Sequence, residues 1–353
     1  MSADVIAAPA ERRSWSRFAT WDVAVIVVAA IVIVVAAVGV EHFGTTRNFG
    51  FLILEMAPIL VLALPLTLII VTGEIDLSVA SMVGLTSASM GAMWDAGLPL
   101  ETILWVTVLI GAVLGAVNGF FVTVLGLPSL AVTIGTLALY RGLAFVLLGD
   151  TAVADFPRPF TNWAIGGIGG EWIPNVTIPI LVLVALFTAV LHATSVGRST
   201  YAIGANPVAA AFAGIPVGKV KFWLYVLSGA VAGLVGVYWT LRFSSARADN
   251  ANGLELTVVA AVLLGGVSIF GGKGTLPGVV GGVVLLTALQ NALRLSGRSA
   301  DQLTIVTGVL LIISVLAPNI VSSARAALTR RRRARVPISH DPVSLSDARK
   351  DPS

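Results

Sequence analysis

The sequence contains no cysteine and only three histidines among its 353 residues. Disulfide bonds and thiolate metal sites are therefore excluded, and the widely separated histidines lack the spacing of metal ligands. Charged residues are also scarce: they make up 11% of the chain, whereas a soluble domain carries about 25%. Because 57% of the residues are hydrophobic, so few charges cannot cover a water-exposed surface. The composition excludes a soluble globular protein.

Long apolar runs make up most of the sequence. Each run has roughly 18–22 residues, enough to cross about 30 Å of hydrocarbon. The sequence predicts an all-α integral membrane protein with about ten transmembrane helices. The third and eighth runs are short and rich in small residues, so either can be a broken or half-spanning element. The predicted spans are 22–40, 51–72, 76–94, 102–125, 128–149, 177–195, 220–241, 256–271, 276–293 and 303–321.

The distribution of lysine and arginine predicts the orientation of these spans. With the N-terminus inside, most basic residues face the cytoplasm, as the positive-inside rule requires. We expect a cytoplasmic tail over 1–20, a membrane domain over 21–322 and a basic, disordered cytoplasmic tail over 323–353. Basic residues beside a cytoplasmic membrane face suit lipid headgroups, so nucleic-acid binding is not expected. Five spans on each side of residues 150–176 suggest an inverted repeat.

A polar stretch at 197–221 lies between two apolar runs and falls on the cytoplasmic side. It holds three basic residues and no acid. Asn206 is a good N-cap, Pro207 fits the first helical position, and Gly214 can end a helix in a left-handed turn. The sequence therefore predicts a short helix over Val208–Ala213, displayed between two membrane spans.

A second polar stretch, VTGEIDLSVAS, joins the second and third runs. Gly73 starts a tight turn that places Glu74 and Asp76 between apolar segments. Acids at membrane depth are costly and usually functional. We expect Asp76 to cap the third helix, with Ser78 in its first turn. Contact with a cytoplasmic partner is the alternative.

Other polar side chains fall inside the apolar runs. Arg141 lies deep in the outer half of the fifth run, where an arginine needs an acid, carbonyl oxygens or a water-filled cavity. It can contact a polar solute, reach outward to solvent or pair with Asp150. Four further residues can line a solute pathway or bond a neighbouring helix: Glu55, Asn118, Gln290 and Asn291.

The glycine-rich stretch LLGGVSIFGGKGTLPG nearly matches a phosphate-binding loop, G-x-x-x-x-G-K-[ST]. Val267 stands at the first glycine position and Gly274 at the serine or threonine position. Nucleotide binding is therefore rejected, and a glycine-rich turn is expected. The sequence also shows no Ser/His/Asp set, carboxylate pair or metal-ligand cluster. We expect no enzymatic activity, no metal and no cofactor.

Glycines at small-xxx-small spacing recur within the spans. Such spacing lets two helix backbones approach closely in lipid. The prediction is tight packing between helices rather than a ligand site. The repeated positions include Gly111, Gly115 and Gly119 in the fourth span and Gly229, Gly233 and Gly236 in the seventh.

Several of these stretches together resemble the permease subunits of bacterial ribose-type sugar ABC importers. The segments TGEIDLSVAS, LPSLAVTIGTLALYRGLAF, GANPVAAAFAGIPVGKVK and LELTVVAAVLLGGVSIFGGKGTLPG occur in the family's order over about residues 50–320. LALPLTLIIVTGEIDLSVAS combined with FSSARADNANGLEL is most similar to permeases for rhamnose or autoinducer 2. The resemblance implies a multi-pass protein of the bacterial plasma (inner) membrane.

The resemblance also implies partners. Two permease subunits, identical or related, form the solute pathway, two ATPase subunits bind below, and an extracellular or periplasmic solute-binding protein delivers the solute. The short helix corresponds to the family's coupling helix, although a glutamate common in related importers is absent. An ion-coupled secondary transporter, with acids such as Glu74 carrying protons, is the alternative. The residues matching the coupling helix are Gly204, Ala205, Asn206, Pro207, Val208, Ala209, Ala210 and Gly214.

Overall fold

The structure, a computed structural model, describes residues 15–168, 173–313 and 316. Helices dominate these residues, and four two-residue strands form two small antiparallel sheets, β1–β4 and β2–β3. A further apolar helix covers Ala300–Ile313. In chain order the elements are α1 (Trp15–Gly39), α2 (Thr46–Val71), α3 (Val79–Asp95), α4 (Leu100–Thr123), α5 (Ser129–Leu148), β1 (Ala152–Val153), α6 (Arg158–Ile165), β2 (Gly167–Ile168), β3 (Ile173–Pro174), α7 (Thr177–Ala193), α8 (Ser195–Ala205), α9 (Pro207–Phe212), α10 (Val217–Phe243), β4 (Ala246–Arg247), α11 (Leu254–Leu264) and α12 (Leu276–Leu295).

The described helices are those of an integral membrane protein. Six are long and apolar enough to cross a membrane, and the bent pair α7–α8 makes a seventh if it counts as one span. The predicted third and eighth spans are the shorter helices α3, with 17 residues, and α11, with 11. The predicted tail at 323–353, most of the tail at 1–20 and the end of the tenth span lie outside the described residues.

Two predicted boundaries were wrong for identifiable reasons. The eighth span was expected to run to residue 271, but α11 ends at Leu264 because a pair of glycines follows, of which Gly266 has a φ of +88°. The sixth span was expected to end at residue 195 in a loop. Instead the chain bends by 64° after Ala193 and continues as α8. Helix α8 contains few apolar residues, so the pattern of hydrophobic runs did not predict it.

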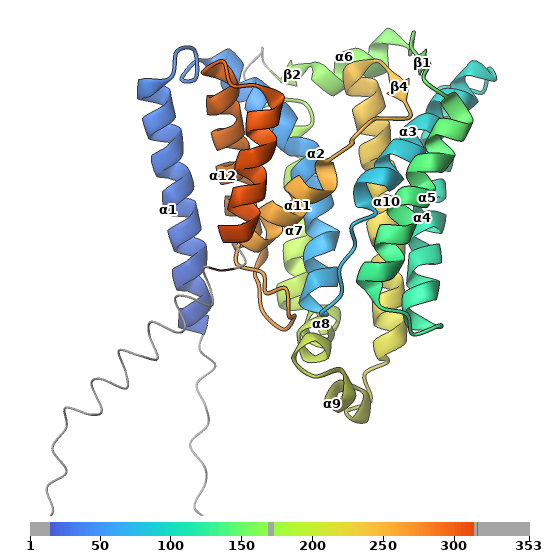
Figure 1. The fold of residues 1–353 in the computed structure, drawn as a ribbon, viewed down its shortest axis with the longest axis vertical. Helices are drawn as coiled ribbons and strands as arrows, with labels where there is room; N and C mark the ends of the chain where they lie inside the picture. Colours follow the sequence, from blue (N-terminus) through green and yellow to red (C-terminus); the bar gives the residue numbers. More distant parts are fainter. Residues whose placement is uncertain (1–14, 169–172, 314–315, 317–353) are drawn as a thin grey trace, which may run out of the picture. The chain divides into compact units, whose positions relative to one another are not determined.

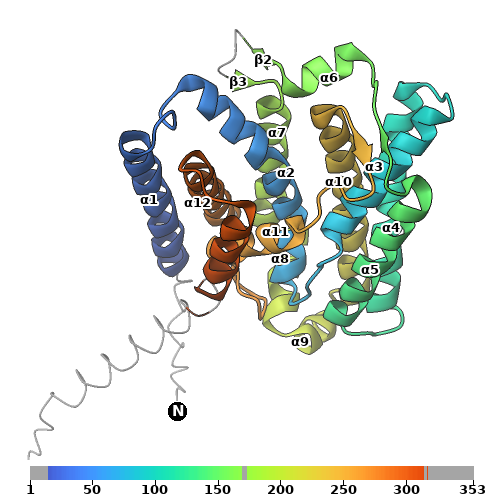
Figure 2. The ribbon, with the colours of Figure 1, turned by 45° about the horizontal axis from the view of Figure 1, so that its top comes forward.

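The elements are arranged so that the two ends of the bundle differ (Figure 1). Helices α1 and α12 lie side by side at one edge, α4 and α5 lie at the opposite edge, and α2, α7, α10 and α11 lie between them (Figures 1 and 2). Helix α6 and the strands occupy one end, and α8 and α9 occupy the other (Figures 1 and 2). The helix α3 occupies the half of the bundle nearer to α6 (Figure 1).

The α4–α10 crossing confirms the close packing predicted from the glycine spacing. A Cβ atom at Gly115 would lie 2.1 Å from the carbonyl oxygen of Tyr225, and one at Gly229 would lie 2.1 Å from that of Gly111. Such distances leave no room for any side chain. The two backbones therefore touch, as small residues permit within a membrane.

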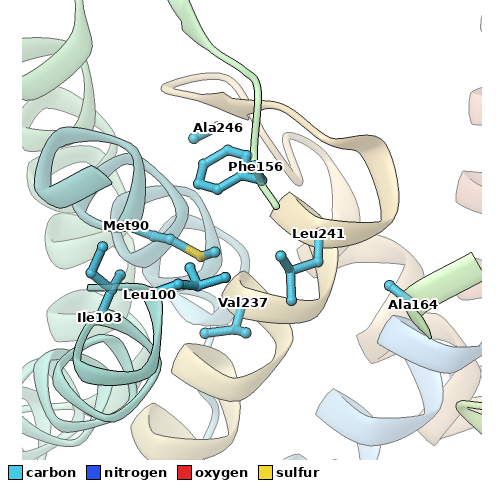
Figure 3. Packing of buried hydrophobic residues seen from close by; sticks show 8 residues of the cluster. All are labelled: Met90, Leu100, Ile103, Phe156, Ala164, Val237, Leu241 and Ala246. Atoms are coloured by element: carbon cyan, nitrogen blue, oxygen red, sulfur yellow. The ribbon is translucent and has the colours of Figure 1, made fainter. Parts of the chain in front are cut away.

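A cluster of buried apolar side chains fastens the connection between α5 and α6 to the bundle (Figure 3). Phe156 from this connection stacks on Trp94 of α3, with ring centroids 5.7 Å apart. Burying a large aromatic ring contributes about 2–3 kcal/mol. The packing holds the α6 end of the molecule in place over α3, α4 and α10. The members are Met90, Leu100, Ile103, Phe156, Ala164, Val237, Leu241 and Ala246.

Candidate functional site

The predicted short helix is present as α9, at the end of the bundle opposite α6. The Oδ1 atom of Asn206 accepts hydrogen bonds from the backbone N–H groups of Val208 and Ala209, both at 3.0 Å. Pro207 is the first helical residue, and Gly214 follows the helix with a φ of +83°. The N-cap, the proline start and the left-handed glycine are all confirmed.

One face of α9 is apolar and uncovered. Phe212 is 90% exposed and Val208 is 64% exposed. The two residues are four apart, so their side chains lie on the same helix face. Ala210 is buried and turns toward the rest of the protein. Phe212 was not singled out from the sequence, although its spacing from Val208 in an alanine-rich helix was a usable signal.

The preceding helix, α8, is pressed against the end of α2. A Cβ atom at Gly204 would lie 1.8 Å from the carbonyl oxygen of Val71. The same oxygen accepts a hydrogen bond of 2.8 Å from the backbone N–H of Gly272, in the glycine-rich turn. The Tyr201 hydroxyl donates to the carbonyl of Gly274 in that turn at 2.6 Å. The loop carrying α9 is therefore joined to both α2 and the glycine-rich turn.

The polar stretch between α2 and α3 is non-helical, and its residues Thr72, Asp76 and Ser78 are buried. Gly73 has a φ of +84° and begins the turn as predicted. The cap assignment was wrong: α3 begins at Val79 and is preceded by Ser78, not Asp76. The Asp76 carboxylate instead accepts from the backbone N–H of Ser78 at 2.9 Å and from its hydroxyl at 2.6 Å. This local bond satisfies the acid and leaves the helix to start two residues later.

Asn118 is completely buried and bonds other helices. Its Nδ2 atom donates to the Ser78 hydroxyl at 2.7 Å, and its Oδ1 atom accepts from the Tyr140 hydroxyl at 3.3 Å. The sequence left open whether Asn118 lines a solute pathway or bonds a neighbouring helix. Its hydrogen bonds link α4 to α5 and to the residue before α3.

Arg141 bonds backbone carbonyls, one of the three kinds of partner expected for an arginine deep in a membrane span. Its Nη1 atom donates to the carbonyl oxygens of Ala248 at 2.7 Å and Asn250 at 2.8 Å, in the connection between α10 and α11. Asp150 is not among its hydrogen-bond partners. In the same connection, the hydrogen bond from Arg247 to Asp249 lowers the pKa of the Asp249 carboxyl.

The remaining predicted pathway residues lie on the other side of the bundle. Glu55 of α2 forms an ion pair with Arg294 of α12. Asn291 accepts a buried hydrogen bond of 3.0 Å from Asn48, and the Gln290 side chain donates to the Thr307 hydroxyl at 2.8 Å. These three residues gather at α2 and α12 and do not meet the pair Asn118 and Arg141 in one site.

A cavity of about 700 Å³ opens at the α6 end of the molecule. The Nη1 atom of Arg242 donates to the Leu54 carbonyl at 2.8 Å, and its guanidinium lies 4.9 Å from the ring centre of Phe243. Apolar walls with a few polar donors suit a small polar ligand. No local sequence pattern marks this cavity, because its lining comes from segments far apart in the chain: Arg47, Gly50, Phe51, Leu54, Asn162, Ile165, Gly166, Gly167, Pro174, Arg242 and Phe243.

The helix bundle, with its cavity at one end and its displayed helix at the other, is that of a multi-pass membrane protein. Residues 48–315 match the family described as branched-chain amino acid transport system / permease component, and the chain belongs to that family. The resemblance noted in the sequence is confirmed, and the protein is a transport permease of the inner membrane.

Curated relatives agree with the family assignment. The chain is 34% identical over 266 residues to the autoinducer 2 import system permease protein LsrD of Yersinia enterocolitica, covering 74% of this chain and 80% of that protein. It is 33% identical over 286 residues to LsrD of Photorhabdus temperata, covering 78% and 85%. These relatives are transport proteins rather than enzymes. No solved structure matches the chain significantly.

Proposed function

We propose that the chain is the permease subunit of an ATP-driven importer and that α9 docks a separate ATPase. The observation that carries this proposal is the uncovered apolar face of α9, formed by Val208 and Phe212 at the end of the bundle opposite the cavity. An exposed phenylalanine on a short capped helix is the kind of anchor that protein interfaces bury. In an ATP-driven importer the ATP site would lie on this partner, because the glycine-rich stretch of the chain does not meet the requirements of a phosphate-binding loop.

The proposed solute is autoinducer 2 or a related sugar-like molecule such as rhamnose or ribose. Support comes from the similarity to autoinducer 2 import permeases. A hydroxyl-rich solute as small as a monosaccharide fits within the cavity of about 700 Å³ and can accept hydrogen bonds from its arginines. None of the five predicted pathway residues lines this cavity. Glu55 follows the cavity-lining Leu54 in sequence and is paired with Arg294, and we keep it as a proposed pathway residue. We assign Asn118, Arg141, Gln290 and Asn291 to helix packing.

The proposed topology has ten spans with both termini in the cytoplasm. It rests on the positive-inside distribution of lysine and arginine, with residues 21–322 as the permease domain. The loop at 197–221 then faces the ATPase, and the cavity faces an extracellular or periplasmic solute-binding protein. A second permease subunit, identical or paralogous, completes the pathway. The proposed coupling segment keeps the residues matched to the coupling helix, of which Val208, together with Phe212, offers the exposed apolar face to the ATPase: Gly204, Ala205, Asn206, Pro207, Val208, Ala209, Ala210 and Gly214.

Uptake into proteoliposomes tests the proposal. The permease is reconstituted with its ATPase, and binding protein loaded with autoinducer 2 or a sugar is added outside. We expect uptake to require ATP and to survive a protonophore. Uptake that persists without ATP and collapses with the protonophore would identify an ion-coupled secondary transporter and reject the proposal.

A further inference from the structure

The break between α2 and α3 carries polar side chains through the interior of the protein. Helix α2 ends at Val71 and α3 begins at Val79, and the residues between them are not helical. Asp76 and Ser78 within the break are fully buried. Unsatisfied backbone groups are costly in a membrane, so such a break persists only where neighbouring helices supply hydrogen bonds.

Helix α10 supplies the first of these contacts through an ion pair. Lys221, in the second turn of α10, pairs with Glu74 of the break. Their side chains are only 15% and 18% exposed. Breaking a buried pair by removing one partner is strongly destabilising, since the other charge is left uncompensated. This pair therefore holds the break to α10 more firmly than a surface ion pair would.

Two further contacts continue along the same face of α10. The Tyr225 hydroxyl lies 3.5 Å from the carbonyl oxygen of Ile75, and the Ser228 hydroxyl lies 3.5 Å from Oδ2 of Asp76. Positions 221, 225 and 228 are spaced i, i+4 and i+7, so they share one face of the helix. Three consecutive residues of the break, 74 to 76, are thus matched to one stripe of α10.

Helix α8 contacts the end of α2, immediately before the break. Gly204 touches the Val71 carbonyl at the last residue of α2. One residue separates the end of α8 from the start of α9, and four residues separate the end of α9 from the start of α10. Both helices that flank α9 therefore contact this region, α8 at the last residue of α2 and α10 at residues 74 to 76 of the break.

We propose that the α10 stripe of Lys221, Tyr225 and Ser228 is a positioning element that makes the α2–α3 break move with α9. The inference rests on the proposed function, in which α9 receives motion from an ATPase. A displacement of α9 reaches α10 through four intervening residues and reaches the break through the Glu74–Lys221 pair. Because α3 follows the break directly, its position then depends on the state of the ATPase.

Charge reversal in the complete importer tests this inference. The variants are Glu74→Lys, Lys221→Glu and the double reversal, with the milder Glu74→Gln in case a reversal prevents folding. ATPase copurification, ATP hydrolysis and solute uptake are measured for each. We expect each single variant to retain the ATPase and to raise the ATP consumed per solute about 10-fold or more, a typical size for a coupling effect. The double reversal should bring that ratio back toward the wild-type value.

An unchanged ratio, with hydrolysis and uptake falling together in every single variant, would overturn the inference and leave the pair a structural contact. A ratio that stays high in the double reversal would also overturn it. Failure of the proposed function is distinguishable, because the wild-type permease would then show neither ATPase copurification nor ATP-dependent uptake.

Discussion

The backbones of Gly204 in α8 and Val71 at the end of α2 are in direct contact, and no side chain fits between them. A methyl group at position 204 would lie 1.8 Å from the Val71 carbonyl oxygen, so α8 would have to move away. This movement would displace the Asn206 cap and α9 after it. The contact therefore links the docking surface to the membrane helices.

Gly204→Ala should lower ATP-dependent uptake about 10-fold, equivalent to about 1.4 kcal/mol. The reason is the enforced shift of α8 and α9 relative to α2. Gly218→Ala is the matched control, because a Cβ atom there has its nearest neighbour at 3.9 Å. Equal uptake by the two variants at equal membrane abundance would contradict the importance of the contact.

Phe212→Ala should weaken the complex with the ATPase roughly 10- to 100-fold, as expected for the loss of a buried aromatic anchor. Copurification and a titration of ATPase against detergent-solubilised permease measure the effect. Folding should not change, since the ring is 90% exposed in the isolated chain. Val38→Ala, at a side chain 87% exposed on α1, is the control. Unaltered affinity in Phe212→Ala would remove α9 as the docking element.

Gly115→Ala should destabilise the protein by about 1–3 kcal/mol through overpacking of the α4–α10 crossing. A methyl group there would lie 2.1 Å from the carbonyl oxygen of Tyr225. Gly135→Ala on α5 is the control, because nothing lies within 4 Å of its added Cβ atom. Thermal unfolding in detergent compares the two. A higher melting temperature for Gly115→Ala than for Gly135→Ala would contradict the packing.

Arg141→Gln should loosen the connection between α10 and α11. The substitution removes the hydrogen bonds to the carbonyl oxygens of Ala248 and Asn250, and each bond to a charged group is worth about 1.5–3 kcal/mol. The chain has no native cysteine, so Asn252→Cys gives a single exposed thiol in this connection. Its maleimide labelling should be several-fold faster in Arg141→Gln than with Arg141 intact. An identical rate would show that the connection does not depend on the arginine.

Local signals in the sequence predicted α9 well. Asn206, Pro207 and Gly214 each act within a few residues, so their pattern locates the helix without knowledge of the tertiary structure. The end of α11 was missed because a hydrophobic run continues past Leu264 while the glycines after it stop the helix. Helix α8 was missed because its small and polar residues give no membrane signal, although glycine there is required by contact with α2.

The polar contacts outside α9 join residues that are far apart in the chain, so the sequence did not predict them. Glu74 and Lys221 are separated by 147 positions, and Arg141 lies 107 positions from Ala248. The sequence showed that a deep arginine needs a partner, but the partner turned out to be backbone carbonyls, which any sequence supplies. The cavity is likewise assembled from α2, α6 and α10, so no local motif marks it.

Site-specific crosslinking from α9 tests the central claim most directly. Ala211→Cys, which keeps the Phe212 ring, and Ile165→Cys each introduce a single thiol, at exposed sites on α9 and α6 at opposite ends of the bundle. Each is labelled with a photoactivatable maleimide in membranes that contain the whole importer, and adducts are identified by mass spectrometry. We expect an adduct between position 211 and the ATPase, with none from position 165. Absence of an ATPase adduct from position 211, or its appearance from position 165, would contradict docking through α9.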